Sequence, residues 1–204
     1  KKREFLILNS NFTIDKKDLK IFYKLIEKRS TREPIAYITN KKSFWNSEFF
    51  VTKDTLIPRP DTELIIENVL KLTKNKESLR VLDIGIGSGG ILLSILKEKK
   101  NFYGTGIDIN KKCLKISKIN AINLKVDKRL KLIKTDVDKL ISSKYDLIVS
   151  NPPYIINKKL KYLDRDVVKY EPTQALDGGL DGLSEIRKVI YKSSELIKKK
   201  GKLI

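Results

Sequence analysis

The sequence contains no histidine and only one cysteine, and these two absences exclude much of the familiar chemistry of enzymes. Without histidine there is no Ser-His-Asp triad, no imidazole base and no histidine metal ligand. Cys113 alone can build neither a disulfide framework nor a cysteine zinc cluster. We therefore expect no metal site, and any catalysis has to use amides, carboxylates, lysines, tyrosines or a bound cofactor.

Long apolar stretches are also missing. The longest, residues 90–96, falls far short of the roughly 20 residues that a membrane-spanning helix needs. The first residues, Lys1 to Glu4, are charged and lack the apolar core of a secretory signal. We therefore expect a protein without membrane contact and with a cytoplasmic location.

Methionine is absent altogether, so Lys1 is not a native start. The chain stops at Ile204, just after a strand is expected to begin beyond Gly201. We therefore expect an excerpt of a longer protein, with strands missing at its C-terminal end.

Acidic residues are few beside the basic ones, with 25 Asp and Glu against 44 Lys and Arg, which gives a formal charge of +19. Arginine contributes only 8 of these cations, and Ile and Asn are abundant, a composition that a coding bias towards A and T produces. The other interpretation is a partner rich in phosphate or acidic groups. The bias accounts for more of the charge, and proximity to the ribosome or RNA through a basic surface stays open.

The chain divides into three stretches. Apolar positions at helical spacing predict a helix over residues 16–29, which ends before Pro34. Residues 35–54 carry short aromatic and β-branched runs around the turn-like Asn40-Lys41-Lys42, and they predict a β-hairpin. We interpret residues 1–34 as a helical piece, 35–54 as a linker and 55–204 as the main domain, incomplete at its C-terminus.

Strands and helices alternate along the main domain. The pattern predicts strands at 79–84, 102–108, 130–135, 145–150 and from 202, and helices capped by Asp61 and at 90–99, 111–121 and 183–200. Such alternation is typical of an α/β fold with a mostly parallel sheet and helices on both faces.

A glycine-rich turn follows the first of these strands and leads directly into a helix. It reads Asp83-Ile84-Gly85-Ile86-Gly87-Ser88-Gly89-Gly90, and glycines permit a tight turn and a close approach of the backbone to a ligand. The second strand ends at Asp108, 19 residues after Gly89, where nucleotide-binding βαβ units carry the acid that binds ribose hydroxyls. The turn therefore predicts a nucleotide-containing cofactor, and Gly90 stands where the third glycine of an NAD site would, so the spacing does not exclude NAD.

The strand at 145–150 ends in Asn151-Pro152-Pro153-Tyr154, and ligands of open parallel sheets bind at such strand ends. The Asn151 side-chain oxygen and the Pro152 carbonyl can each accept one N–H of an amide or aromatic amine. Two fixed acceptors would aim that nitrogen at an electrophile and favour the positive charge that grows on it. The ring of Tyr154 can cover the planar acceptor and face a cationic cofactor.

Residues 81–89, Val-Leu-Asp-Ile-Gly-Ile-Gly-Ser-Gly, resemble the first motif of class I methyltransferases, whose fold is Rossmann-like. This resemblance implies S-adenosyl-L-methionine as the cofactor, with Asp83 near its methionine amino group, Asp108 on the ribose and Asp136 beside the adenine. The cofactor-binding residues that it implies are Asp83, Gly85, Ile86, Gly87, Ser88, Gly89, Asp108, Asp136, Val137 and Asn151.

Asn-Pro-Pro-Tyr resembles the signature of methyltransferases that act on nitrogens of planar systems, namely adenine N6, guanine N2 and glutamine amides. Two further segments select among these. Residues 55–63, Thr-Leu-Ile-Pro-Arg-Pro-Asp-Thr-Glu, and residues 170–182, Tyr-Glu-Pro-Thr-Gln-Ala-Leu-Asp-Gly-Gly-Leu-Asp-Gly, resemble segments of the HemK/PrmC-type release factor glutamine methyltransferases, as do residues 32–38.

Members of that family methylate the glutamine of the Gly-Gly-Gln motif in peptide-chain release factors, so the resemblance implies a release factor as the protein substrate. It also implies that residues 1–34 are the remnant of an N-terminal helical domain and that 55–204 is the methyltransferase domain. The implied catalytic residues are Asn151, Pro152 and Tyr154. The implied substrate-binding residues are Asn151, Pro152, Pro153, Tyr154, Arg59, Asp61 and Glu63.

Two alternatives remain open. An adenine-N6 or guanine-N2 nucleic-acid methyltransferase shares the loop and suits the charge, although no separate base-reading domain is visible. A non-catalytic RNA-binding module also suits the charge but leaves Asn151 and Asp108 unexplained. Elsewhere, we interpret Cys113 as a small buried apolar residue and the lysine runs 97–100 and 198–200 as solvated helix ends.

Overall fold

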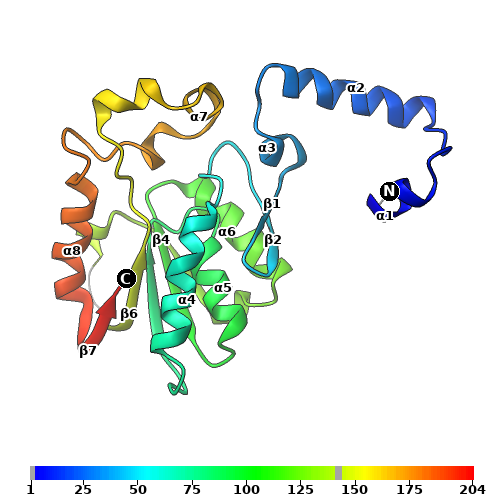
Figure 1. Cartoon of the computed structure of the whole chain (residues 1–204). Helices are drawn as coiled ribbons and strands as arrows, with labels where there is room; N and C mark the ends of the chain where they lie inside the picture. The colour runs from blue at the N-terminus through cyan, green and yellow to red at the C-terminus, as the bar shows by residue number, and fades with distance from the viewer. Residues whose placement is uncertain (1–2, 141–143) are drawn as a thin grey trace.

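The computed structural model describes residues 3–140 and 144–204, and its centre is a five-stranded sheet (Figure 1). The strand order is β5-β4-β3-β6-β7, and every neighbouring pair runs parallel. The strands are β3 (Arg80–Ile84), β4 (Tyr103–Asp108), β5 (Leu130–Lys134), β6 (Tyr145–Ser150) and β7 (Ile197–Leu203). The predicted α/β fold with a parallel sheet is confirmed.

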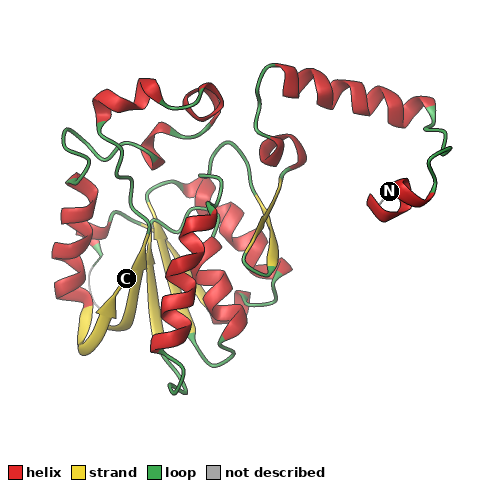
Figure 2. Ribbon diagram, viewed as in Figure 1, coloured by secondary structure: helices red, strands yellow, loops and turns green. Residues whose placement is uncertain are grey.

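Helices cover both faces of this sheet (Figure 2). Helices α4 (Glu63–Leu72), α5 (Gly90–Glu98) and α6 (Lys111–Asn123) pack on one face, and α8 (Ser184–Leu196) packs on the other. Because side chains alternate along a strand, Val81 of β3 joins the core under the first three helices, whereas Leu82 packs in the core with Val189 of α8. Burial on both faces explains why β3 and β6 are largely apolar along their length.

The N-terminal part consists of α1 (Arg3–Leu8), α2 (Lys16–Ser30), α3 (Ile35–Thr39) and a hairpin of β1 (Lys41–Phe44) and β2 (Ser47–Phe50). Figure 1 shows α1 and α2 extending away from the sheet, and no residue of α2 is buried. The predicted helix at 16–29 and the hairpin within 35–54 are confirmed, while Lys1 and Lys2 lie outside the described residues.

The predicted turn at Asn40–Lys42 was wrong. Residues 35–39 form the short helix α3, which follows Pro34 at its N-cap and ends where Asn40 adopts a left-handed conformation with φ 56°. Lys41 and Lys42 then belong to β1, and the hairpin turns instead at Trp45 and Asn46. A left-handed asparagine ends a helix as readily as it makes a turn, so its local signal was ambiguous.

Two other local expectations were wrong. Asp61 does not cap α4, because it lies within the 3₁₀ helix η1 (Pro60–Thr62), and Thr62 at the N-cap makes no side-chain capping bond. Residues 198–200 do not end a helix, because α8 stops at Leu196 and Ile197 pairs with Tyr145 on β6. The lysines therefore lie on β7, at the edge of the sheet, where exposed lysine side chains are well tolerated.

Residues 151–183 form an irregular segment above the carboxyl ends of the strands (Figure 1). It contains the 3₁₀ helices η4 (Asn157–Tyr162) and η5 (Thr173–Ala175) and the short helix α7 (Arg165–Tyr170), none of which the sequence pattern predicted. In the part of the chain that the structure describes, no helix is long and apolar enough to cross a membrane.

Candidate functional site

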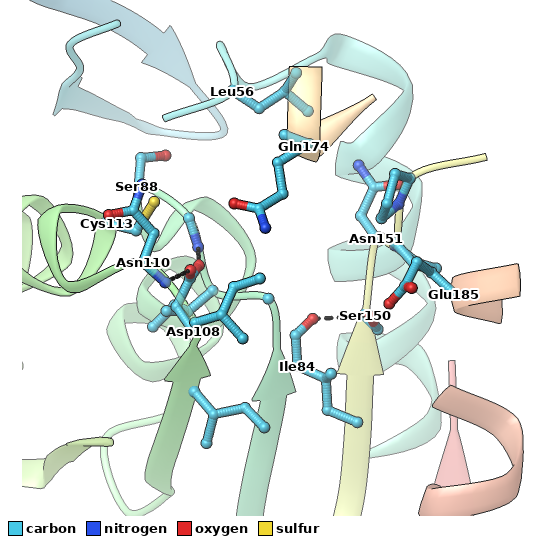
Figure 3. Close-up of a pocket in the computed structure, with 18 of the residues that line it drawn as sticks. Leu56, Ile84, Ser88, Asp108, Asn110, Cys113, Ser150, Asn151, Gln174 and Glu185 are labelled. Carbon is cyan, nitrogen blue, oxygen red and sulfur yellow. Dashed lines mark hydrogen bonds between the residues drawn. The ribbon is translucent and has the colours of Figure 1, made fainter. Parts of the chain in front are cut away.

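A cavity of about 510 Å³ opens at the carboxyl ends of β3, β4 and β6, within the size range of small-molecule sites (Figure 3). The turn after β3, the end of β4 and the loop after β6 all contribute to its lining, as strand polarity in a parallel sheet requires. Within residues 3–140 and 144–204, no group of three or more Cys, Asp or Glu residues is placed to hold a metal ion. Polar side chains and backbone groups in its lining are able to bind an organic ligand.

The glycine-rich turn forms the floor of the cavity. The amides of Gly85 and Ile86 donate to the carbonyl of Ile107, which folds the turn over β4. Gly87 and Gly89 have positive φ angles of 56° and 89°, and a Cβ on Gly89 would lie 2.5 Å from a methyl carbon of Leu93. These glycines therefore allow a backbone path that other residues would strain.

Helix α6 holds this turn in place from behind. The Ser117 hydroxyl donates to the carbonyl of Gly87 over 2.7 Å, and the buried Asn120 amide donates to the carbonyl of Ser88 over 2.8 Å. Asn120 also exchanges two hydrogen bonds with the backbone of Phe50 in β2. The hairpin and the cavity floor are thus fixed to the same helix.

Asp83 is a buried carboxylate directly beneath the turn. It is 1% exposed, and both carboxylate oxygens lack a hydrogen-bond partner among the described residues. Burial raises its pKa to about 7; the amide of Leu92 opposes this rise and the nearby Asp108 adds to it. An unpartnered buried carboxylate is costly, and a cationic ligand group close to it would offset that cost.

Asp108 ends β4 at the edge of the cavity (Figure 3). One of its oxygens accepts the amide of Gly87 over 3.0 Å, and the other accepts the amide of Asn110 over 2.8 Å. Burial raises the pKa of this carboxyl, while the two amides lower it. Each oxygen keeps a lone pair that can accept a further hydrogen bond from a ligand hydroxyl.

Asp136 and Val137, which follow β5, also line the cavity. Asp136 forms an ion pair with Lys188 of α8 over 2.8 Å, and hydrogen bonds from Lys188 and from the amide of Asp138 help to lower the pKa of Asp136 although burial opposes this. Val137 is buried in the core beside α8. Lys188 was not predicted as a site residue, because nothing in the local sequence separates it from Lys192, the other lysine of α8.

The loop after β6 carries Asn151, which lies across the cavity from Asp108 (Figure 3). The Asn151 side-chain NH₂ donates to the hydroxyl of Thr62 over 3.2 Å, which leaves the side-chain oxygen available to a ligand. Pro152 and Pro153 also line the cavity. Tyr154 is 64% exposed and lies outside the lining, where its ring is free to cover a large acceptor.

The segment at 177–182 supports that loop through its glycines. A Cβ on Gly178 would lie 2.8 Å from the Cα of Tyr154, and one on Gly182 would lie 2.6 Å from the Tyr154 carbonyl oxygen. Ile155 also forms an isolated β-bridge with Asp177. The glycines therefore let one backbone pack directly on another, and the segment holds the loop in place rather than being a plain surface loop.

The three charged residues of the 55–63 segment occupy different places. Arg59 lines the cavity and pairs with the buried Glu171 over 2.5 Å. Glu63 accepts the amide of Trp45 over 2.7 Å at the hairpin turn, and neither it nor the exposed Asp61 belongs to the cavity lining. Their predicted contacts with a substrate stay predictions.

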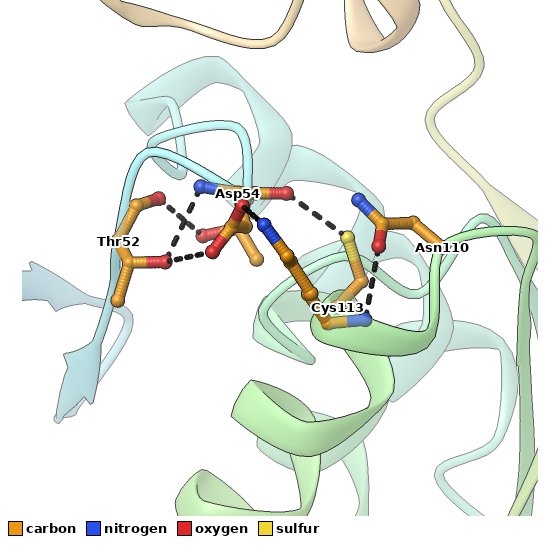
Figure 4. Close-up of polar contacts among 6 residues, drawn as sticks. Thr52, Asp54, Asn110 and Cys113 are labelled. Atoms are coloured by element: carbon orange, nitrogen blue, oxygen red, sulfur yellow. Dashed lines mark hydrogen bonds and ion pairs between the residues drawn. The ribbon is translucent and has the colours of Figure 1, made fainter.

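Asp54, in the turn that follows the hairpin, also lines the cavity, and Figure 4 shows the polar contacts around it. Asp54 pairs with Lys112 of α6 over 3.0 Å, and its carbonyl accepts the Cys113 thiol over 3.1 Å. Cys113 is buried as predicted, and burial together with Asp108 and Asp54 raises its pKa to about 12. It is therefore an unreactive thiol in the cavity wall.

Several lining residues were missed by the sequence interpretation. They are Asp54, Leu56, Thr62, Asn110, Gln174, Glu185 and Lys188. Asn110 follows Asp108 closely, and Leu56, Thr62 and Gln174 lie within the segments 55–63 and 170–182 that resemble the family, whereas Asp54, Glu185 and Lys188 carried no such signal.

Comparison with known proteins places this arrangement in a family. The family model of the methyltransferase small domain matches residues 60–172, and that of the PrmC N-terminal domain matches residues 1–39. The chain is 40% identical over 204 residues to the release factor glutamine methyltransferase of Clostridium acetobutylicum, covering 98% of this chain and 72% of that protein. It is also 40% identical over 177 residues to the protein of the same name from Caulobacter vibrioides, covering 86% of this chain and 61% of that one.

A solved structure shares the fold of a large part of this chain. The catalytic domain of hMettl16, in complex with MAT2A 3′UTR hairpin 6, superposes with a TM-score of 0.60 over 76% of this chain and 58% of that chain. The two sequences are 21% identical, so the likeness concerns the fold alone.

Proposed function

Because the chain belongs to the family of release factor glutamine methyltransferases, we propose that it transfers a methyl group from S-adenosyl-L-methionine to the side-chain amide nitrogen of the glutamine in the Gly-Gly-Gln motif of peptide-chain release factors. The observation that carries this function is that the glycine turn, Asp108 and Asn151 line one cavity. The residues present fit the cofactor, because the buried Asp83 carboxylate has no hydrogen-bond partner among residues 3–140 and 144–204 and lies beneath a glycine turn that leaves room for a ligand.

We assign the binding of the cofactor to residues at the carboxyl ends of β3, β4 and β5. Asp83 would attract the amino group of the methionine moiety, Asp108 would accept ribose hydroxyls, and Asp136 with Val137 would border the adenine. When bound, S-adenosyl-L-methionine supplies an electrophilic methyl group on a positively charged sulfur. The turn residues Gly85 to Gly89 would lie against it through their backbone.

We assign the acceptor side to the loop after β6. The Asn151 oxygen accepts one N–H of the substrate amide, and the Pro152 carbonyl accepts the other. The Thr62 hydroxyl accepts a hydrogen bond from the Asn151 NH₂ group. This contact orients the Asn151 side chain so that its oxygen is left to accept the substrate N–H. As positive charge grows on the substrate nitrogen, both acceptors stabilise it, and the excess proton passes to solvent without a histidine base.

The substrate can be tested directly. The chain, the labelled cofactor and a purified release factor are incubated together, and mass spectrometry locates the methyl group. We expect it on the Gly-Gly-Gln glutamine, with no label on naked DNA or ribosomal RNA. A methyl group found on adenine or guanine instead would overturn the substrate and leave the cofactor site standing.

The first site prediction concerns Asp108. Asp108→Ala should weaken cofactor binding by about 1.5–3 kcal/mol, the range for hydrogen bonds to charged groups. Titration calorimetry measures the change, and Asp108→Asn, which keeps one acceptor oxygen, is the matched control and should lose less. Unchanged affinity in the alanine variant would remove Asp108 from the site.

The second site prediction concerns Asp83 and the pH dependence of cofactor affinity. Its pKa of about 7 is raised from 3.8, so without cofactor the carboxyl is protonated below pH 7, and the stability that this form contributes falls as pH rises from 3.8 and is lost once pH passes about 7. A bound ammonium group needs the ionised form, so binding must release this proton at acidic pH. Between about pH 5 and pH 7 cofactor affinity should rise by up to ~10-fold per pH unit.

The matched control is Asp83→Asn, which has the same shape but cannot titrate. It should bind more weakly at pH 7 and show a flat profile across the same range. An unchanged slope in this variant would assign the pH dependence to another group.

The cellular setting is a further proposal. We place the reaction in the cytoplasm, where release factors act in bacteria. A ribosomal or RNA environment would suit the formal charge of +19, and it predicts that the chain binds RNA less tightly as salt rises.

A further inference from the structure

Gln174 is the only glutamine in the sequence, and it lines the same cavity as Asn151. Figure 3 shows its side chain directed into the space between Asp108 and Asn151. No hydrogen bond to its amide occurs among the described residues, and the residue is exposed. A free glutamine amide thus lies inside a site whose chemistry is the methylation of glutamine amides.

The backbone on both sides of Gln174 is anchored. On one side Glu171 is buried and held by Arg59 and by the amide of Ile57. On the other side the carbonyl of Leu176 accepts the amide of Ile155, directly after the catalytic loop, over 3.1 Å. Gln174 therefore stays beside the loop, and its side chain alone sets how far the amide reaches.

We propose that Gln174 is an intramolecular counterpart of the substrate glutamine and is itself methylated in cis. The inference rests on the proposed function, because it uses the same cofactor and the same Asn151 and Pro152 acceptors. The bond between the methyl carbon and the sulfonium sulfur breaks as a bond to the Gln174 Nε2 forms. That nitrogen releases one proton to water, and the products are N-methylated Gln174 and S-adenosylhomocysteine.

The test is incubation of the purified chain with S-adenosylmethionine and no release factor. Trypsin releases residues 170–187 as one peptide, because no lysine or arginine lies between Tyr170 and Arg187. We expect one added methyl group on this peptide, located at Gln174 by fragmentation, at a rate per molecule that does not change when the chain is diluted. The Asn151→Ala chain serves as the unmethylated reference.

The matched control moves the amide by one position. Thr173→Gln/Gln174→Thr keeps a single glutamine in the chain but places it at a position outside the cavity lining. This variant should gain no methyl group, and neither should Gln174→Glu, which has the same size but no amide nitrogen. Methylation of the moved glutamine at the wild-type rate would overturn the proposal.

A second measurement needs no turnover. With S-adenosylhomocysteine present, a release factor should bind Gln174→Ala about 2- to 10-fold more tightly than the wild type, if the amide of Gln174 occupies the acceptor position half to nine tenths of the time. Equal affinities would show that the two glutamines do not share a position and would overturn the inference.

The outcomes also separate this inference from the proposed function. A chain that methylates a release factor but never Gln174 overturns the inference alone. A chain that methylates Gln174 but no release factor supports the inference and contradicts the substrate. A rate that rises with chain concentration would show methylation between molecules and would exclude the cis reaction.

Discussion

Asn151→Ala is expected to slow methyl transfer by about 10²–10³-fold, which is ~3–4 kcal/mol, because one well-placed polar group is lost from the transition state. The structure supports this role, since Thr62 takes the donor end of the Asn151 amide and leaves its oxygen to the acceptor nitrogen. The measurement is the single-turnover rate with saturating cofactor, which isolates the chemical step from binding. Near-normal turnover in this variant would contradict the mechanism itself.

Asn151→Asp provides the matched comparison. It keeps the acceptor oxygens but adds a negative charge near the positively charged sulfur, which would favour the ground state as well as the transition state. It also loses the NH₂ group that donates to Thr62. We therefore expect a partial loss of rate, smaller than that of the alanine variant.

Two variants of Tyr154, on the same loop, distinguish the contribution of its ring to activity from that of its hydroxyl. Its side chain is 64% exposed, so removing the ring should damage substrate positioning more than folding. Tyr154→Phe should keep most of the activity, and Tyr154→Ala should lose most of it. Equal damage by both changes would show that the hydroxyl is the working group.

Arg59→Ala is expected to lower the free energy of unfolding by about 3 kcal/mol, because it leaves the Glu171 carboxylate buried without its charge partner. The Glu171 side chain is 2% exposed, whereas that of Arg59 is 38% exposed, so the value lies at the low end of the range for buried pairs. After the change, the described contact of Glu171 with the amide of Ile57 would remain. Urea unfolding measures the loss.

The matched control also removes the buried negative charge of Glu171. Arg59→Ala/Glu171→Gln keeps an oxygen that can accept the Ile57 amide, so it should recover much of the stability that Arg59→Ala loses. The same variants also decide what Arg59 does. Unchanged stability in Arg59→Ala together with lost methylation would show that Arg59 acts on the substrate, as the sequence resemblance implies, and not as an anchor.

Much of the fold was predictable because its signals are local. The apolar strands β3 and β6, the glycine turn and the acid at the end of β4 are each contained in short stretches of sequence. In a parallel sheet all carboxyl ends lie at one edge, so the meeting of Asp108 and Asn151 at one cavity followed from their positions on strands. The local errors fell where a signal served two structures, as at Asn40, which ends a helix in place of forming a turn.

Other features depended on contacts between residues far apart in the chain. Arg59 and Glu171 are 112 residues apart, and Thr62 and Asn151 are 89 apart, so no periodic pattern could pair them. The close packing of Gly178 and Gly182 on the backbone of Tyr154 likewise has no local signal in the sequence.

The sequence by itself thus determined the fold class and the positions of the glycine turn and of the Asn151 loop at strand ends, because each depends on residue types at fixed local spacing. Only the tertiary structure decided which way the Asn151 amide faces, that Arg59 is tied to Glu171, and that Gln174 lies in the cavity. These features arise where the irregular segment 151–183 packs over the sheet, and that packing is set by long-range burial and hydrogen bonding, which leave no local period in the sequence.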